Sequence, residues 1–352
     1  MPTRRHAASR RPALRCPVTP LARLARLSVL ALAGGASCGA LAQTRVSLSG
    51  LLDVGVFEDF DEVNKLGTVQ RSHITLDVSE PLSPGLTATA RLQHRLELDT
   101  GAGEGAGSKP FWHGESTVGL QGGFGHLRLG RALDVVYAYD YSYDPWANFN
   151  RIASPAWHNW HWNYASDRSS NNGQAEYGRL ANGMFYDSPS LHGVSLHLSH
   201  SFEDPSAPGG TRTGDNTGWA LRYGQAAWNA MLARSRNRSG DTVHFAGLAY
   251  TTGGLTLMGA YDLSVFRASP ADSEAEVFTL GLSHATGSTT WKAGWGRRRV
   301  DEGVDSSVSQ FLGLGADWAL SRRSTLYASV GRQAPRSGDA RTAYGLGISH
   351  SF

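Results

Sequence analysis

The feature that most constrains this chain is an alternation of apolar with small or polar side chains, which continues to the last residue, Phe352. At the end of the chain, Tyr344, Leu346 and Ile348 are separated by single small residues. Alternation over about ten residues predicts a β-strand whose two faces meet different surroundings. The pattern recurs in the segments 46–56, 194–199, 291–296 and 312–318. A helical repeat is nearly absent, so an all-β fold is expected.

The connections between these segments indicate which β fold it is. Short turns alternate with longer polar stretches, which is typical of outer-membrane barrels, whereas a soluble sandwich has no reason to place every long connection at one end. A closed sheet also has no edge, and unsatisfied edge groups are costly in lipid. We therefore predict a transmembrane antiparallel β-barrel of about sixteen strands, joined by fifteen connections. The turns are expected at 81–85, 122–125, 188–193, 225–227, 251–254, 285–288 and 321–324, and the loops at 58–68, 98–112, 132–175, 203–217, 236–242, 265–276, 299–308 and 333–341.

The first 42 residues differ in composition from the rest of the chain. They contain seven Arg residues and no acid, then an apolar stretch at 27–36 and the small-residue ending Ala40-Leu41-Ala42. These are the parts of a secretory signal peptide, and the apolar stretch is too short to span a bilayer as a helix. We expect cleavage after Ala42, which leaves residues 43–352 as one exported barrel in the outer membrane of a Gram-negative cell. Cys38 also allows a lipoprotein-type cleavage, although Gly35 stands where such sites usually have an aliphatic residue.

Removal of the leader changes the composition. Cys16 and Cys38 would both be lost, so rigidity must come from a closed sheet rather than from disulfides. Seven of the 33 Lys and Arg residues lie in the leader, which leaves 26 against 30 Asp and Glu, so nucleic acid is not an expected partner. No later stretch approaches 18 consecutive apolar residues, and the 42 Gly residues fit a barrel with a wet interior.

Several segments resemble the general diffusion porins of Gram-negative bacteria, in particular the trimeric, sixteen-stranded porins of the betaproteobacterial type. The resemblance rests on VSLSGLLDVGV at 46–56, STVGLQGGFGHLRLGR at 116–131, NGMFYDSP at 182–189 and the terminal Phe352. It implies a homotrimer of water-filled pores among outer-membrane lipids, and a third external loop folded into the lumen. It also implies that the barrel-assembly machinery recognises the C-terminal strand, with Phe352 as the signal. The stretch 132–175 is the longest connection and follows the fifth strand, where such a loop is expected.

Alternation also predicts which polar side chains face the lumen. Because the second, third and fifth strands lie close together, their inward arginines would form a basic wall, and such a wall at a narrow aperture favours anions. The alternative is that these arginines are ordinary hydrated lumen residues. The predicted lumen residues are Arg71 and His73 on the second strand, Arg91, Gln93 and Arg95 on the third, and Arg128 on the fifth.

The long loop is expected to face this wall. It carries Asp134, Asp140 and Asp144, with Asp167 further along, and we expect these acids to oppose the arginines across the pore. The loop is also rich in aromatic residues, which either form a stacking surface for sugars or aromatic solutes or pack the loop against the wall. We favour packing. The rings are Tyr137, Tyr139, Tyr141, Tyr143, Trp146, Phe149, Trp157, Trp160, Trp162 and Tyr164.

These observations predict a porin for passive diffusion of small hydrophilic solutes and ions, with no reaction and no catalytic residue, because no nucleophile elbow or paired carboxylates occur. No cofactor is expected either. His158 and His161 have a spacing compatible with zinc, but no third ligand accompanies them. Two alternatives belong to other classes. One is a non-conducting outer-membrane barrel that acts as an adhesin or receptor, and the other is a barrel hydrolase, which requires a His with Ser or acidic partners.

Overall fold

The computed structural model describes residues 43–104, 109–161, 178–202, 215–238, 240–267, 272–303 and 305–352. Residues 43–352 form one compact unit. The predicted leader, 1–42, lies outside the described residues, as do Trp162, Tyr164 and Asp167 of the long loop. The cleavage site after Ala42 and the lipoprotein alternative at Cys38 therefore stay predictions.

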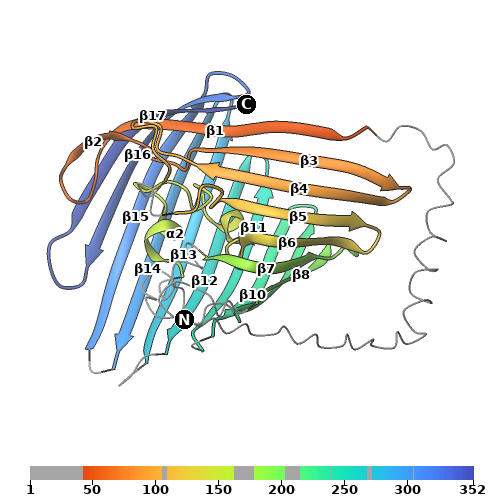
Figure 1. Cartoon of the computed structure of the whole chain (residues 1–352). Coiled ribbons are helices and arrows are strands. Elements are labelled where there is room, and N and C mark those ends of the chain that lie inside the picture. The colour runs from red at the N-terminus through yellow and green to blue at the C-terminus, as the bar shows by residue number, and fades with distance from the viewer. Residues whose placement is uncertain are drawn as a thin grey trace, which may run out of the picture. The chain divides into compact units, whose positions relative to one another are not determined.

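Strands make up most of the described residues of this unit, and two short helices are found among the described residues of one loop (Figure 1). Among the described residues, no helix is long and apolar enough to cross a membrane. The helices are η1 (Asp140–Tyr143) and α2 (Pro155–Asn159). The strands are β1 (Arg45–Glu58), β2 (Asn64–Gly67), β3 (His73–Ser83), β4 (Leu86–Arg95), β5 (Glu115–Gly122), β6 (Gly125–Leu133), β7 (Arg179–Asp187), β8 (Val194–Ser201), β9 (Thr217–Gln225), β10 (Trp228–Arg236), β11 (Thr242–Thr252), β12 (Leu255–Phe266), β13 (Ser273–Thr286), β14 (Thr289–Glu302), β15 (Asp305–Ala319), β16 (Ser324–Pro335) and β17 (Arg341–Ser351).

The sheet closes on itself between the first and last strands. β1 pairs antiparallel with β17 from Leu51 opposite Ser351 to Glu58 opposite Tyr344. On its other edge, β1 pairs with β3 over its first half and with β2 over its last four residues. β2 and β3 thus share one position in the wall, and the described barrel has sixteen positions, as predicted. At the seam, the backbones of Gly50 and Phe352 exchange two hydrogen bonds of 3.2 Å, which makes Phe352 the last rung of the closed sheet.

The connections alternate between short and long, with two departures from the prediction. The expected loop 58–68 contains the short strand β2. The stretch 299–308 was expected to be a loop, but β14 runs to Glu302 and β15 starts at Asp305, so only residues 303–304 connect them. The physical reason is that these strands extend beyond the apolar band, where both faces of the sheet carry polar residues, such as the consecutive exposed Ser306 and Ser307. Alternation is lost there, and the strand ends look like a loop in the sequence.

The two faces of the wall carry the predicted difference in polarity. Large apolar side chains such as Leu48, Leu248, Leu314 and Leu346 are 50–65% exposed on the outside. The inner face carries glycines and small polar residues, which meet the long loop. An apolar exterior and a polar or small-residue interior are what a barrel in lipid requires.

Candidate functional site: the pore wall and the long loop

The long loop, which we call L3 (residues 134–178, described to His161), lies against the inner face of the wall from β8 to β17. Asn150 donates from Nδ2 to Ser329 Oγ on β16 at 3.1 Å, and Trp160 donates from Nε1 to Thr279 Oγ1 on β13 at 3.2 Å. α2 contacts β13, β14 and β15, and η1 contacts β11 and β12. Figure 1 shows α2 in front of the inner faces of these strands. L3 therefore occupies one side of the lumen.

Inward glycines give L3 the room to lie so close. A Cβ atom on Gly313 or Gly331 would lie within 3.0 Å of the backbone carbonyl of Ala153 or Ile152, closer than real side chains approach backbone. Side chains of Tyr143, Pro145 and Trp146 meet other inward glycines of β11, β13, β14 and β15 in the same way. Because glycine has no Cβ, the loop backbone can pack directly on the strand backbone. The inward glycines of this wall thus form the surface on which L3 docks.

The three loop acids do not oppose the arginines across the pore as predicted; all three are buried between L3 and the wall. Asp134 is fully buried and accepts hydrogen bonds from Ser199 Oγ at 3.1 Å and Ser235 Oγ at 2.7 Å. Asp144 accepts from the backbone N–H groups of Trp146 and Asn148, and its Oδ2 accepts from Ser154 Oγ at 3.0 Å. L3 has no strand partner to accept hydrogen bonds from its backbone N–H groups, and these carboxylates accept some of them instead. The carboxylates are therefore buried rather than directed into the pore.

Asp140 belongs to a buried ionic clamp between L3 and the wall. Its Oδ2 lies 2.9 Å from His161 Nε2, and His161 Nδ1 lies 2.6 Å from Asp262 Oδ2 on β12. Burial alone would lower the pKa of His161, but the carboxylates of Asp262 and Asp140 raise it to about 9. His161 is therefore charged at neutral pH and fixes the described end of L3 to the wall.

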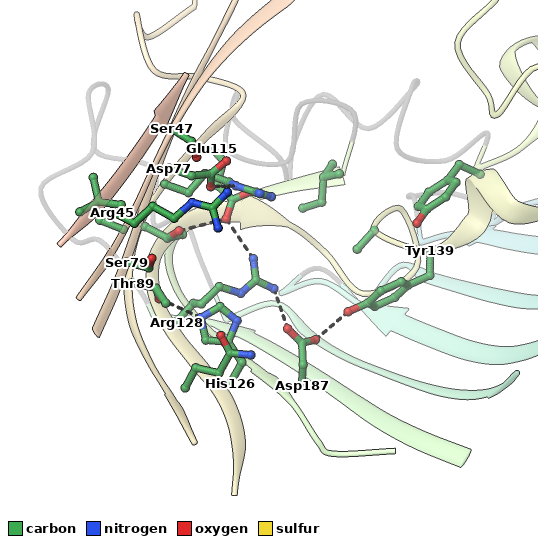
Figure 2. Close-up of a pocket in the computed structure, with 18 residues that line it drawn as sticks. Arg45, Ser47, Asp77, Ser79, Thr89, Glu115, His126, Arg128, Tyr139 and Asp187 are labelled. Atoms are coloured by element: carbon green, nitrogen blue, oxygen red, sulfur yellow. Dashed lines mark hydrogen bonds and ion pairs between the residues drawn. The ribbon is translucent and has the colours of Figure 1, made fainter. Parts of the chain in front are cut away.

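The side of the lumen opposite L3 contains a cavity of about 720 Å³ (Figure 2). β3, β4, β5 and β6 form one side of it, and Tyr139 and Tyr141 of L3 line the other. Its charged lining is balanced, with three arginines and three acids: Arg45, Arg91, Arg128, Asp77, Glu115 and Asp187. Arg91 and Arg128 face inward, as the alternation predicts. The acids beside them were not predicted from the sequence.

Each of these two arginines is paired with acids of the same wall. Arg91 Nε lies 2.7 Å from Asp77 Oδ1, directly opposite on β3. Arg128 lies between Glu115 and Asp187, at 3.0 Å and 3.1 Å, as Figure 2 shows. The signal for Asp77 was present in the sequence, since it has the same parity as His73. Basic and acidic side chains thus alternate on this wall, and the acids largely compensate the positive charge of the arginines.

A second cavity of about 390 Å³ lies nearer the external loops and includes Arg71. Arg71 was expected on the second strand, but it lies in the break between β2 and β3. Asp53 holds that break, because its Oδ1 accepts from the backbone N–H groups of Val69 at 2.9 Å and Gln70 at 2.7 Å. The Arg71 guanidinium lies over the rings of Trp157 and Phe149, 4.6 Å and 5.6 Å from their centres. L3 and the first external loop therefore meet at this arginine.

The other predicted wall residues are partly or fully buried. Gln93 donates from Nε2 to Thr75 Oγ1 at 3.0 Å, and His73 Nδ1 contacts the Arg71 carbonyl oxygen at 3.1 Å. Arg95 is buried, with Nη1 3.9 Å from Glu104 Oε2. Burial would raise the pKa of Glu104, but a hydrogen bond with His113 and the nearby cations Arg95, Arg71 and Lys109 lower it overall, so this acid is charged and compensates the cations. The structure thus places these three residues in the barrel wall, but they do not form a basic surface open to the pore.

The aromatic residues of L3 divide into two groups. Tyr143, Trp146 and Trp160 are at most 6% exposed and pack against the wall, which agrees with the packing interpretation. Tyr139 and Tyr141 line the first cavity and Trp157 lines the second. His158 stacks on Phe311 at 4.5 Å, and burial lowers its pKa to about 4. Among the described residues, no group of three ligands suits a metal ion.

Three side chains on the wall are hydrogen-bonded in the order serine, histidine, aspartate, which is the order found in serine hydrolases. Ser195 Oγ lies 2.9 Å from His197 Nε2, and His197 Nδ1 lies 2.7 Å from Asp187 Oδ1. Ser195 and His197 are two residues apart on β8, so both face inward. However, the Tyr139 ring lies 4.2 Å from the His197 ring, and Tyr139 also donates to Asp187 at 2.7 Å. The chain therefore holds L3 against β7 and β8.

Comparison with known proteins identifies the family. A family model described as Gram-negative porin matches residues 27–337. The chain is a Gram-negative porin. This porin is 26% identical over 373 residues to outer membrane porin protein 32 of Delftia acidovorans, covering 94% of this chain and 99% of that protein. It is also 25% identical over 400 residues to an outer membrane porin protein of Bordetella pertussis, with coverage of 93% and 99%.

Solved structures agree with the barrel fold. The porin superposes on a structure titled anion-selective porin from Comamonas acidovorans with a TM-score of 0.74 and 23% identity, covering 88% of this chain and all of that one. The trimer form of OmpT from Vibrio cholerae gives a TM-score of 0.66 at 12% identity, with coverage of 88% and 99%. At these identities the likeness concerns the fold. Together with the family match, the barrel shows an outer-membrane porin, which forms a water-filled channel for passive diffusion of small hydrophilic solutes.

Proposed function

We propose that solutes cross this porin between L3 and the wall of β3 to β6, and that L3 narrows the lumen there. The observation that carries the proposal is the cavity of about 720 Å³, which has charged strand residues on one side and loop tyrosines on the other. L3 fills the opposite side of the lumen, because its backbone packs on the inward glycines. A polar, charge-lined passage beside a fixed loop suits small hydrophilic solutes.

We further propose a preference for anions, set by Arg71, Arg91 and Arg128 together with Arg45. Arg45 lines the first cavity, and no ion pair is found for it among the described residues. Since acids compensate Arg91 and Arg128, we expect the preference to be modest. The structure from Comamonas acidovorans, which is titled an anion-selective porin, supports the direction of the preference.

Paired substitutions test this filter by measurement of the reversal potential in a salt gradient. R91Q leaves Asp77 without its partner and is expected to shift selectivity toward cations. One charge several ångströms from a passing ion is worth about 1 kcal/mol, or roughly fivefold in the permeability ratio. R91Q/D77N restores the charge balance and should return the ratio to that of the wild-type porin. The triple variant R71Q/R91Q/R128Q should shift it further. Reversal potentials of R91Q and of the triple variant equal to that of the wild type would exclude these residues from the filter.

We propose that the porin has no hydrolytic activity and that the chain of Ser195, His197 and Asp187 anchors L3. Asp187 is already compensated by Arg128 at 3.1 Å and by Tyr139, which supports an anchoring role. A fluorophosphonate probe should leave Ser195 unlabelled, and specific labelling that S195A abolishes would support the hydrolase alternative. Stepwise single-channel conductance in planar bilayers is expected, and its absence would favour the adhesin or receptor.

We also propose that the porin assembles as a homotrimer in outer-membrane lipid. The resemblance to trimeric porins and the likeness to the trimer form of OmpT from Vibrio cholerae support this oligomeric state. Mass determination of the detergent-solubilised, unheated protein should give three chains per particle. A mass corresponding to one chain would contradict the proposal.

A further inference from the structure

The second cavity, of about 390 Å³, is enclosed by segments of three external loops: the first loop, the loop between β4 and β5, and L3. Hydrogen bonds fix these segments to one another. The Leu98 N–H donates to Thr68 Oγ1 at 3.3 Å, and the Arg151 N–H donates to the Val69 carbonyl oxygen at 3.2 Å. The cavity is therefore preformed, and its volume falls within the range of roughly 300–1,000 Å³ that small-molecule sites have.

The charged groups of this cavity are not all paired. Glu97 of the loop between β4 and β5 and Arg151 of L3 both line it, and no ion pair is found for either among the described residues. The Nε of Arg151 is buried and has no hydrogen-bond partner in the described part of the chain. The other two lining acids are compensated by lysines, at 3.2 Å and 3.4 Å, in the pairs Asp59–Lys65 and Glu104–Lys109. One carboxylate and one guanidinium thus remain for a solute.

This arrangement distinguishes the second cavity from the first. All three acids of the first cavity, Asp77, Glu115 and Asp187, lie within 3.1 Å of an arginine nitrogen. The described lining of the first cavity thus retains an unpaired cation, Arg45, but no unpaired acid, which suits an anion. The second cavity retains one group of each sign, which suits a solute that carries both charges.

The lining of the second cavity is also balanced in total charge, and it offers an aromatic surface. Its three basic residues and three acids are Arg71, Lys109, Arg151, Asp59, Glu97 and Glu104. His158 adds no charge near neutral pH, because burial lowers its pKa to about 4. Trp157 lines the same cavity, and the guanidinium of Arg71 is held over its ring, 4.6 Å from the ring centre. A solute with a net charge therefore gains little from the cavity as a whole, whereas an apolar group can pack on the partly exposed tryptophan.

We propose that this cavity binds a small zwitterion with an apolar side chain, an amino acid or a dipeptide, before the solute enters the pore. The guanidinium of Arg151 donates to the carboxylate, since its paired N–H groups match two carboxylate oxygens. Glu97 accepts from the ammonium group, and the side chain packs on Trp157. The role of this site rests on the proposed passage beside L3, because the second cavity lies nearer the external loops and precedes that passage for a solute from outside.

Isothermal titration calorimetry of the assembled, detergent-solubilised porin tests both charges of the solute. L-phenylalanine and glycylphenylalanine carry a carboxylate and an ammonium group at different separations. In contrast, 3-phenylpropanoate lacks the ammonium group and 2-phenylethylamine lacks the carboxylate. We expect at least one of the two zwitterions to bind, and both analogues to bind about tenfold more weakly, since one charged hydrogen-bonded pair contributes about that factor.

Variants assign each charge of the solute to its residue. E97Q should weaken binding of the zwitterion about tenfold and leave that of 3-phenylpropanoate unchanged, whereas R151Q should weaken it about tenfold and leave that of 2-phenylethylamine unchanged. R151K keeps the charge but not the paired donors, so its affinity should lie between those of R151Q and wild type. The matched controls are E62Q and R336Q, which alter exposed external charges outside the cavity and should bind as wild type does.

Several results would overturn the assignment. They are no heat of binding for either zwitterion, or a binding that neither E97Q nor R151Q weakens. Equal affinity of wild type for the zwitterion and for 3-phenylpropanoate would make the cavity a site for carboxylates, and losses in the controls as large as in E97Q would reduce the effect to total charge. If R151Q fails to assemble, E97Q and the two analogues decide the question. Binding is measured without conduction, so its outcome is separate from the reversal potentials that test the passage.

Discussion

The docking of L3 on glycine can be tested by the addition of a single methyl group. In Gly331→Ala and Gly313→Ala, the new Cβ would lie 2.9 Å from the Ile152 carbonyl carbon and 2.8 Å from the Ala153 carbonyl carbon, with the oxygens closer still. Both clashes involve backbone, which cannot rotate away as a flexible side chain can. The segment of L3 at Ile152 and Ala153 must therefore leave the wall.

The cost of this displacement follows from what the segment buries. Ile152 and Ala153 are fully buried, and Asn150 bonds to Ser329. Burial of an isoleucine side chain contributes about 1.5–3 kcal/mol and one buried hydrogen bond about 1 kcal/mol, so docking of the segment should weaken by about 2–4 kcal/mol. At 1.4 kcal/mol per tenfold, the undocked population rises roughly 30- to 700-fold.

Hydrogen exchange measures this population directly. The amides of Ile152 and Ala153 both donate to Asn150 Oδ1, at 2.9 Å and 2.8 Å, so their exchange reports on local opening of L3. Gly315→Ala, whose Cβ would lie 3.1 Å from the Ala328 carbonyl oxygen, should accelerate exchange less. The matched control is Gly224→Ala on β9, because nothing lies within 4 Å of its Cβ position. Equal exchange in Gly331→Ala and Gly224→Ala would refute the docking argument, whereas exchange in the strands should remain slow in every variant.

Two further predictions concern the His161 clamp and the C-terminal residue Phe352. The raised pKa of His161 means that its clamp stabilises the folded porin fully below pH 6.5, and that this stability is lost as the pH rises through about 9. Denaturant unfolding should show a loss of about 3 kcal/mol between pH 6 and 10 in the wild type; a loss of the same size in H161Q would show that another group titrates. Deletion of Phe352 removes the last rung beside Gly50 and the proposed assembly signal, so the truncated porin should insert poorly into the outer membrane while inserted molecules conduct normally. Efficient insertion of a chain that ends at Ser351 would contradict this.

Much of the barrel could be predicted from the sequence because a strand has a period of two. Alternation along 46–56 or 312–318 determines which side chains face lipid, and the spacing of turns determines how many strands close the sheet. The same rule correctly placed Arg91 and Arg128 on the inner face. It failed at 299–308, where β14 and β15 rise above the lipid and both of their faces meet water.

Only the tertiary structure decided what the charges do. Asp77, Glu115 and Asp187 come from three strands, and their pairing with Arg91 and Arg128 depends on register and on the proximity of strand ends. L3 has no period, so its sequence could not show that Asp134, Asp140 and Asp144 are buried and satisfy polar groups of L3 and the wall rather than oppose the arginines. The sequence by itself thus determined the barrel and its two faces, because those follow from local alternation. The path of L3 and the charge balance of the pore arise from contacts between distant residues, which only the closed barrel brings together.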